Sequence, residues 1–312
     1  MRVYGSDAIR NVAFVGHGGS GKTTLVDALA FVSGASRRHG NIKDGTTLTD
    51  YTPDEIARQH SISLGLAYAE WMDTKLNLLD TPGYLDFFGE VVTGLHAADA
   101  AVVVVSGVSG VEVGTEKAWE VCDRLHLPRL IFVGQMDKEH ANFERVFADV
   151  KAHLSPKVLP VEVPIGEGST FRGIVNLFSG KSHIYKPGTK SGEYDEVEVP
   201  AEHRAEVKKY SDLLIETVAA TDDALIERYL GGEEIPREEV IAALRTAVVA
   251  GSIVPLFVGS ATLTFGMRAL LTKMVEIFPA AADVPPPVDA PLLGRVFKTT
   301  SEPHVGDVTL FR

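Results

Sequence analysis

GHGGSGKT, at Gly16-His17-Gly18-Gly19-Ser20-Gly21-Lys22-Thr23, fits the pattern GxxxxGK[ST] at every position. The apolar run Val12–Val15 precedes it and predicts a strand that ends at the loop. Apolar residues then recur at helical spacing over Leu25–Val32, and Gly34 is suited to end that helix. A strand, a loop of this pattern and a helix, in this order, indicate a phosphate-binding loop.

The residue types of this glycine-rich loop (Gly16–Thr23) suit the binding of phosphate groups. Glycines let backbone N–H groups approach and cradle phosphates, and the helix after Gly21 directs the positive end of its dipole at them. Lys22 adds a point charge for the β- and γ-phosphates, and Thr23 offers a hydroxyl to Mg²⁺. The loop therefore predicts a nucleotide with at least two phosphates and leaves the base open.

Composition limits the class of protein. The 312 residues, 45% of them hydrophobic, suffice for one large domain or two smaller ones. No apolar stretch approaches the roughly 18–20 residues of a membrane span, and the first ten residues hold no apolar signal core. The single cysteine, Cys122, excludes an internal disulfide framework and is interpreted as a small buried hydrophobe. We therefore expect a cytoplasmic protein.

Negative charge is concentrated in one part of the chain. Residues Ser191–Val240 hold 15 acidic and 5 basic residues, and so contribute −10 of the net charge of −12. A basic face for free nucleic acid is not evident. We favour a solvated face on a pair of helices, with a docking surface for a basic partner as the alternative.

Strand-like and helical segments alternate on either side of this acidic stretch. Such near-continuous apolar runs are typical of a parallel sheet covered on both faces, so we expect a doubly wound, mainly parallel α/β domain of the P-loop NTPase class with its ligand at the carboxyl ends of the strands. The expected strands are Lys75–Asp80, Ala100–Ser106, Arg129–Val133 and Val254–Val258, and the expected helices are Glu112–Leu125, Phe143–Leu154 and Leu270–Ile277.

The alternation stops after Leu154, which indicates an α+β insertion subdomain. Short β-like pieces at Val158–Pro164 and Gly173–Leu177 are followed by helical stretches at Ala201–Ala220 and Arg237–Ala250. We therefore assign residues 1–157 and 252–284 to the nucleotide-binding domain and 158–251 to the insertion.

The last residues, 285–312, indicate a linker followed by the start of another domain. The run Pro285–Pro287 cannot be helical, and Leu292–Phe297 and Val308–Phe311 predict two strands. Because a lone hairpin is at best marginally stable, we expect the chain to be a fragment of a longer protein.

A second motif narrows the ligand. Asp80-Thr81-Pro82-Gly83 follows a predicted strand, downstream of the glycine-rich loop. In P-loop proteins an aspartate at this place orders Mg²⁺. Gly83 is suited to bring its N–H to a γ-phosphate without a side chain in the way.

The segment Leu76–Lys138, which contains this motif, resembles the core of translational GTPases of the elongation factor G-like kind. Gly259-Ser260-Ala261 is similar to the guanine-binding GSA loop of that family, and Phe171–Tyr185 (FRGIVNLFSGKSHIY) resembles its insertion. Leu292–Arg312 resembles the opening of its second domain, a β-barrel. The resemblance implies a GTPase that switches conformation on the ribosome.

The resemblance also implies roles for single residues. It makes Asp44–Gly65 the first switch segment and places Gly83 and Tyr84 at the start of a second. Lys22, Gly83 and Tyr84 are the expected catalytic residues, and Thr23, Ser61 and Asp80 the expected Mg²⁺ residues. The residues expected to bind GTP or GDP are Gly16, His17, Gly18, Gly19, Ser20, Gly21, Lys22, Thr23, Thr24, Asp80, Gly83, Gln135, Asp137, Ser260 and Ala261.

Asp137 also indicates guanine by its chemistry. A carboxylate at a strand end accepts two hydrogen bonds from N1–H and N2–H₂, two donors that adenine lacks. A site built on such pairs rejects the wrong partner by roughly 10⁴-fold.

The sequence departs from the family at both ends of the expected site. The usual NKMD reads Gly134-Gln135-Met136-Asp137, and because one lost hydrogen bond costs about 1 kcal/mol, we expect weakened guanine binding. Gly19 replaces an aspartate, which puts assistance by a monovalent cation in doubt.

The remaining departures affect hydrolysis. Tyr84 replaces the histidine that orients the attacking water, and a phenol is a poor base at pH 7. Ser61 replaces a threonine, while Gly18 and His60 replace the apolar pair beside that water. We expect intrinsic hydrolysis to be slow, on the order of 10⁻⁴ s⁻¹. His60 is interpreted as a polar switch residue that faces solvent, with a relocated water-positioning group as the less favoured alternative.

Three functions follow in order of preference. The first is a monomeric GTPase whose partners are guanine nucleotide, Mg²⁺ and the ribosome, with no membrane and no free nucleic acid. The second is a guanine-nucleotide-binding module that acts by occupancy with little or no hydrolysis. The third, an ATP-using enzyme, is disfavoured by Asp137 and by the GSA loop.

Overall fold

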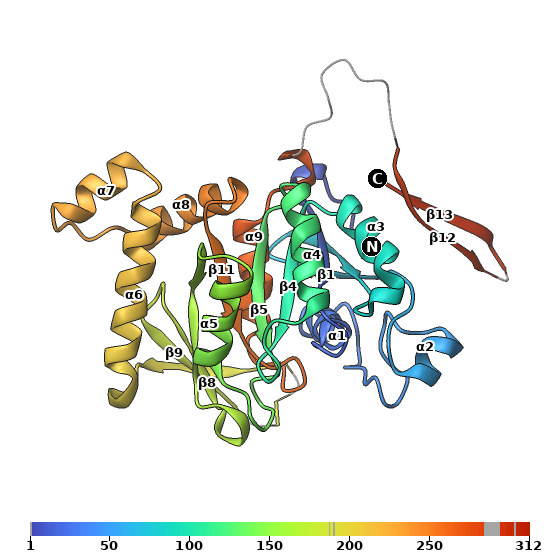
Figure 1. The fold of residues 1–312 in the computed structure, drawn as a ribbon, viewed down its shortest axis with the longest axis horizontal. Helices are drawn as coiled ribbons and strands as arrows, with labels where there is room; N and C mark the ends of the chain where they lie inside the picture. Colours follow the sequence, from blue (N-terminus) through green and yellow to red (C-terminus); the bar gives the residue numbers. More distant parts are fainter. Residues whose placement is uncertain (1, 187, 190, 284–293, 303) are drawn as a thin grey trace, which may run out of the picture.

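Buried apolar runs form the strands of one large sheet (Figure 1). The computed structural model describes residues 2–186, 188–189, 191–283, 294–302 and 304–312. Neighbouring strands of the sheet are parallel except for β2, which runs antiparallel to β3. In spatial order the strands are β2 (Gly65–Trp71), β3 (Thr74–Asp80), β1 (Ile9–Val15), β4 (Ala100–Ser106), β5 (Arg129–Gly134), β11 (Val254–Val258) and β6 (Val158–Pro160).

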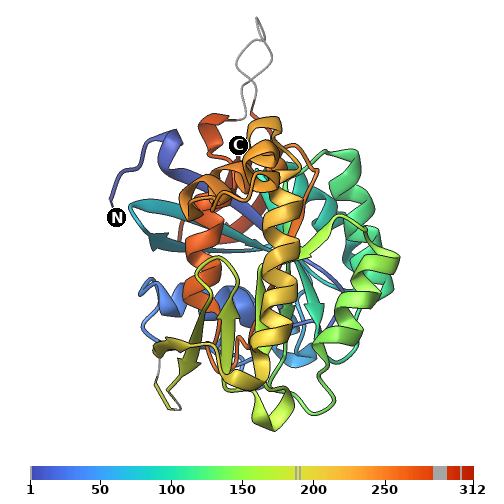
Figure 2. The ribbon, with the colours of Figure 1, turned by 90° about the vertical axis from the view of Figure 1, so that its left-hand side faces the viewer.

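Helices cover both faces of this sheet (Figure 2). On one face α1 (Lys22–Val32) packs beside α9 (Met267–Ile277). On the other face lie α3 (Phe88–Ala97), α4 (Val113–Arg124) and α5 (Phe143–His153). The predicted doubly wound, mainly parallel α/β fold is therefore confirmed.

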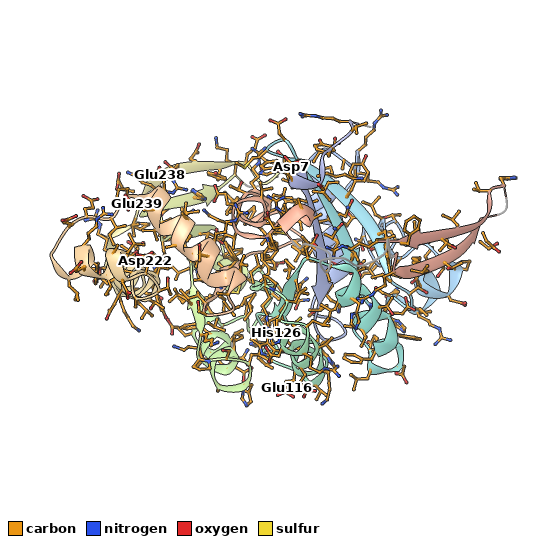
Figure 3. The ribbon with its side chains drawn as sticks, turned by 90° about the horizontal axis from the view of Figure 1, so that it is seen from above. Asp7, Glu116, His126, Asp222, Glu238 and Glu239 are labelled. Atoms are coloured by element: carbon orange, nitrogen blue, oxygen red, sulfur yellow. The ribbon has the colours of Figure 1, made fainter. Side chains whose placement is uncertain are left out.

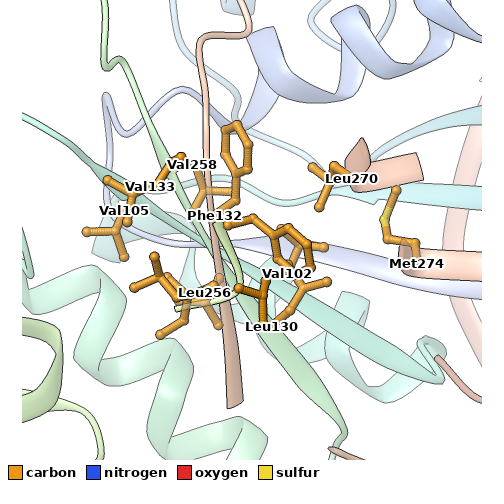
Figure 4. Packing of buried hydrophobic residues seen from close by; sticks show 14 of the residues in the cluster. Val102, Val105, Leu130, Phe132, Val133, Leu256, Val258, Leu270 and Met274 are labelled. Carbon is orange, nitrogen blue, oxygen red and sulfur yellow. The ribbon is translucent and has the colours of Figure 1, made fainter. Parts of the chain in front are cut away.

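The core occupies both faces of the central sheet (Figure 4). Val102, Phe132 and Leu256 come from three strands of the sheet and are at most 1% exposed. Val102 and Phe132 face Leu270 and Met274 of α9, which are fully buried, whereas Leu256 lies on the opposite face of the sheet. Each such side chain stabilises the fold by about 1.5–3 kcal/mol relative to an exposed position, so the uninterrupted apolar runs of the sequence are explained by burial on both faces.

The insertion has a sheet of its own, which is antiparallel. Its strands, in spatial order, are β10 (Tyr194–Glu198), β9 (Lys181–Tyr185), β8 (Gly173–Asn176) and β7 (Glu162–Ile165). The helices α6 (Arg204–Ala219), α7 (Asp223–Leu230) and α8 (Arg237–Val249) follow. Helix α8 packs against both α6 and α9, and so joins the insertion to the central sheet.

Part of the acidic character of these helices has a structural use (Figure 3). The Asp222 carboxylate caps α7 by accepting hydrogen bonds from the N–H groups of Ala224 and Leu225, both 3.0 Å away. Glu239 forms an ion pair with Arg228 at 2.5 Å. Asp222 and Glu238 are exposed, which agrees with the interpretation of this region as a solvated helical face.

The structure corrects two of the predicted strands. The piece predicted at Val158–Pro164 is divided at Val161, because β6 pairs with β11 in the central sheet while β7 pairs with β8. The strand predicted at Leu292–Phe297 is shifted toward the C-terminus: β12 runs Val296–Glu302 and pairs with β13 (Gly306–Phe311). Pro285–Pro287 and residues 292–293 lie outside the described residues. The division into domains stays a prediction.

Several elements were not predicted. Short length or interior glycines hide them from a search for apolar periodicity, as in α3, which contains Gly89 and Gly94. The unpredicted elements are β2, β9, β10, α2 (Pro53–Arg58), α3 and α7, together with the 3₁₀ turns Ser6–Ala8, Leu85–Phe87, Gly168–Thr170 and Ala281–Asp283. A further 3₁₀ turn, Ala201–His203, forms the first part of the helix predicted at Ala201–Ala220.

The β12–β13 hairpin lies beside α3 (Figure 1). The Arg312 guanidinium donates to the carbonyl oxygens of Ala97 and Ala98 at the end of α3 and pairs with Asp99. Lys298 donates to the carbonyl oxygen of Leu64. Within the described part of the chain, no helix is long and apolar enough to cross a membrane.

Candidate nucleotide-binding site

The glycine-rich loop lies at the carboxyl end of β1, as predicted. Gly21 precedes α1 with a φ of +96°, a left-handed conformation that favours glycine. The Lys22 side chain, only 5% exposed, folds back over the loop and donates to the carbonyl oxygens of Gly16, at 3.0 Å, and His17, at 2.8 Å. Burial lowers the pKa of Lys22 to about 8. The loop thus surrounds one buried amine.

Oxygen ligands gather beside this amine, at a cavity of about 140 Å³ that we call the inner cavity. The Thr23 and Ser61 hydroxyl oxygens are 3.0 Å apart. Asp80, at the end of β3, accepts a hydrogen bond of 2.6 Å from the Thr49 hydroxyl, and its second carboxylate oxygen is buried without a partner among the described residues. Both carboxylate oxygens of Asp50 are also buried without a hydrogen-bond partner among the described residues.

Both carboxylates carry an electrostatic cost in the absence of a cation. Burial, together with the neighbouring Asp50, raises the pKa of Asp80 to about 7 against the opposing effects of Thr49, Thr23 and Lys22. Burial also raises the pKa of Asp50. A divalent cation bound nearby would offset this cost.

The donor set fits Mg²⁺. This ion prefers hard oxygen ligands and keeps several of its own waters. Two hydroxyls and two carboxylates with unpartnered buried oxygens provide direct and water-mediated contacts of that kind. No cluster of three or more His, Cys, Asp or Glu side chains suited to a metal occurs among the described residues, so such a site would depend on hydroxyls and phosphate oxygens.

Two glycines, Gly18 and Gly83, and the rings of His60 and Tyr84 also line the inner cavity. A Cβ atom at Gly83 would lie 2.5 Å from the Gly18 amide nitrogen, so a side chain here would collide with the loop backbone. A Cβ atom at Gly18 would lie 3.1 Å from ring carbons of Tyr84. The Tyr84 and His60 ring centroids are 4.7 Å apart. Tyr84 therefore covers Gly18, and His60 faces the same cavity.

A second, larger cavity of about 620 Å³, the outer cavity, adjoins the inner one. Gln135 lies between them with a φ of +61°. Its side-chain oxygen accepts a hydrogen bond of 2.6 Å from the Ser106 hydroxyl, and its amide donates to the Gly19 carbonyl oxygen at 2.9 Å. Gln135 thus ties the end of β4 to the glycine-rich loop, although the sequence departs from NKMD here.

The other residues expected at the base divide into two groups. Asp137 and Ala261 line the outer cavity, together with Lys138. Ser260 is fully buried, does not line the cavity, and accepts a hydrogen bond from the Leu263 N–H instead. The His17 ring turns toward α4, where Nδ1 accepts a hydrogen bond of 3.2 Å from the Gly114 N–H.

Sequence reasoning missed three residues that shape this site. Asp50 and Thr49 carry no local motif, and they reach Asp80 because the chain folds across the ends of the strands. Glu55 is 2% exposed and accepts hydrogen bonds from the N–H groups of Ile62 and Ser63, which fixes the backbone next to Ser61. Thr52 and Glu55 form a capping box on α2, and its pattern, a threonine followed three residues later by a glutamate, is recognisable in the sequence.

Comparison with known proteins agrees with this geometry. Residues 7–280 match the family described as Elongation factor Tu GTP binding domain. The chain belongs to this family. The GTP-binding domain is 33% identical to "Elongation factor G 2" of Syntrophomonas wolfei subsp. wolfei (strain DSM 2245B / Goettingen), with 99% of this chain and 47% of that protein covered. It thus carries the GTP-binding and GTPase fold of translation factors.

A solved structure is also similar. The GTP-binding domain matches a crystal structure of a protein from Thermus thermophilus with a TM-score of 0.88 and 39% identity, covering 98% of this chain and 45% of the other. The chain spans about half the length of both relatives.

Proposed function

We propose that this chain is the GTP-hydrolysing switch of an elongation factor G-like protein. The observation that carries the proposal is the inner cavity, where a buried lysine, two hydroxyls and the Asp50 carboxylate meet at the end of a glycine-rich loop, with the buried Asp80 carboxylate next to the cavity. Lys22 and the loop N–H groups would hold the phosphates of GTP. Thr23 and Ser61 would bind Mg²⁺, with Asp50 and Asp80 acting through its waters.

The reaction is the direct attack of water on the γ-phosphorus. Lys22 and the N–H of Gly83 stabilise the charge that develops on the phosphate oxygens. Mg²⁺ held by Thr23 and Ser61 would supply positive charge that offsets the negative charge of the phosphates. We expect hydrolysis to be slow without an activator, on the order of 10⁻⁴ s⁻¹, because Lys22 is the only Lys or Arg that lines the inner cavity among the described residues.

Guanine would be read in the outer cavity. Asp137 is suited to accept from the N1–H and N2–H₂ of guanine, and the Gln135 contacts hold the cavity wall in place. The test is calorimetric titration of nucleotide-free protein with Mg·GDP and, in parallel, with Mg·ADP. We expect heat of binding for GDP alone. Equal binding of the two nucleotides would show that Asp137 does not select the base.

The proposed partner is the ribosome, and the proposed setting is the cytoplasm, with the chain as a monomer. Support comes from the printed name of the relative, "Elongation factor G 2". Sedimentation with purified ribosomes, in the presence of a non-hydrolysable GTP analogue or of GDP, tests the partner. Stronger sedimentation with the analogue is expected for a switch, and light scattering tests the monomer.

A second candidate is a module that binds guanine nucleotide and acts by occupancy. It is favoured by Tyr84, whose phenol lies over Gly18 where a stronger base would assist hydrolysis. Multiple-turnover phosphate release, with and without ribosomes, distinguishes the two functions. Turnover that rises with ribosomes supports the switch, and the absence of turnover in both conditions supports the module.

A further inference from the structure

The first switch segment places one imidazole at the inner cavity. Helix α2 ends at Arg58, and Gln59 follows in the left-handed conformation with a φ of +57°. The His60 N–H then donates to the Glu55 carbonyl oxygen at 3.3 Å, which turns the chain back toward the glycine-rich loop. As a result, His60 lines the inner cavity together with Lys22 and Gly83. This is not the solvent-facing position expected from the sequence.

Hydrogen bonding fixes which ring nitrogen of His60 is free. Nδ1 lies 3.2 Å from the Ser61 carbonyl oxygen. A carbonyl oxygen only accepts, so the neutral imidazole must carry its proton on Nδ1. Nε2 is then left with a lone pair that accepts a hydrogen bond from water.

The rings of Tyr84 and Phe87 pack beside this imidazole. The two ring centroids are 4.7 Å apart, and the Phe87 ring centroid lies 6.0 Å from that of the imidazole. The Tyr84 ring itself rests on Gly18, where any side chain would meet it. A neutral phenol is a weaker acceptor than an imidazole nitrogen. The cavity therefore has an aromatic wall at residue 84 and its acceptor at residue 60.

We propose that His60 orients the water that attacks GTP in this protein. This rests on the proposed GTP hydrolysis. Nε2 accepts a hydrogen bond from the water, whose oxygen forms a bond to the γ-phosphorus. The bond between that phosphorus and the β–γ bridging oxygen breaks, and its electron pair leaves with GDP. The proton that the attacking water loses ends on inorganic phosphate, so the imidazole is unchanged after each turnover.

Three variants of the full chain test the assignment, and a fourth, Tyr84→Phe, tests the phenol as the alternative acceptor. In His60→Asn the shorter amide is suited to donate to the Ser61 carbonyl but presents no acceptor at the Nε2 position. In His60→Gln the longer side chain brings an oxygen toward that position. His126→Asn is the matched control, because His126 is exposed after the C-terminal end of α4 (Figure 3), whereas the other end of this helix, at Gly114, contacts the glycine-rich loop. The readouts are the single-turnover rate of Mg·GTP hydrolysis and the calorimetric affinity for a non-hydrolysable GTP analogue.

We expect H60N to lower the hydrolysis rate about 10²-fold, which is the lower end of the contribution of a positioned acid–base group. The analogue affinity should stay within about twofold, because the loss affects the transition state and not the ground state. H60Q should recover part of the rate, and H126N should match the unmodified chain. A structural role for His60 would lower affinity and rate together, and H60Q would not restore the rate.

Other results would contradict either the role of His60 or the proposed function, and the two cases can be distinguished. An H60N rate equal to the unmodified rate overturns the role of His60. So does a larger loss in Tyr84→Phe than in H60N, since that result would place the acceptor on the phenol. Failure of the unmodified chain to bind the analogue would instead contradict the proposed function. Binding of the analogue without any hydrolysis of GTP would agree with a GTP-binding site but would contradict a role of His60 in hydrolysis.

Discussion

The inner and outer cavities differ in how closely they follow the sequence motifs and in how deeply their polar groups are buried. Lys22 in the inner cavity and Asp80 next to it lie where the motifs place them, and both are at most 5% exposed. At the outer cavity Gly134-Gln135 departs from NKMD, Asp137 is half-buried, and Gln135 contacts the loop through a side-chain amide. A buried charge is costly unless it has fixed partners, whereas a neutral contact is easily made by other residues in its place.

This difference predicts that changes at the inner cavity have the larger effects. Lys22→Ala should weaken Mg·GDP binding about 10³-fold, or ~4 kcal/mol, because the phosphates lose a buried cationic partner. Lys117→Ala, on the exposed face of α4, serves as the control in calorimetric titration. A tenfold loss or less in Lys22→Ala would contradict the contrast between the two cavities.

Asp137 tests the outer cavity directly. Asp137→Asn should weaken GDP binding about 10²-fold, because hydrogen bonds to a charged group contribute about 1.5–3 kcal/mol. The amide N–H is suited to donate to the C2 carbonyl of xanthine, so the same variant should gain affinity for xanthosine diphosphate. Competition titration with both nucleotides measures the change. Unaltered preference for GDP would show that the base is read elsewhere.

Two glycines at the inner cavity test whether a rigid backbone neighbour and a movable side-chain neighbour give different effects. Gly83→Ala forces a Cβ atom against the Gly18 backbone, which we expect to cost about 1–3 kcal/mol and to weaken nucleotide binding about tenfold or more. Gly18→Ala meets the Tyr84 ring instead, and this ring is 44% exposed and free to shift. Its effect should be about twofold. Equal effects in the two variants would contradict the difference between a rigid and a movable neighbour.

The smallest effect on the outer cavity is expected at Gln135. Gln135→Ala removes the contacts to Ser106 and Gly19, which together should change GDP affinity about fivefold, or ~1 kcal/mol. Calorimetry at a single temperature resolves such a change. If GDP affinity were unaltered, the link between the outer cavity and the glycine-rich loop would have no energetic role.

Much of the fold was predictable because its signals are local. The strands Ala100–Ser106 and Val254–Val258 were predicted with the bounds that the structure gives, since both are uninterrupted apolar runs buried on both faces. By contrast, β6 and β7 form one β-like stretch in the sequence, interrupted only by the charge of Glu162. Their division between two sheets depends on pairing with β11 and β8, which no pattern within that stretch specifies.

The sequence by itself determined the glycine-rich loop, the place of Lys22 and Asp80, and the parallel α/β class, because spacing and periodicity along the chain specify them. Tertiary structure alone decided that Asp50 joins Asp80, that Gln135 reaches Gly19, and that His60 faces the inner cavity. These contacts join segments distant in the chain. Their formation depends on the packing of whole elements, and no local pattern of residues records it.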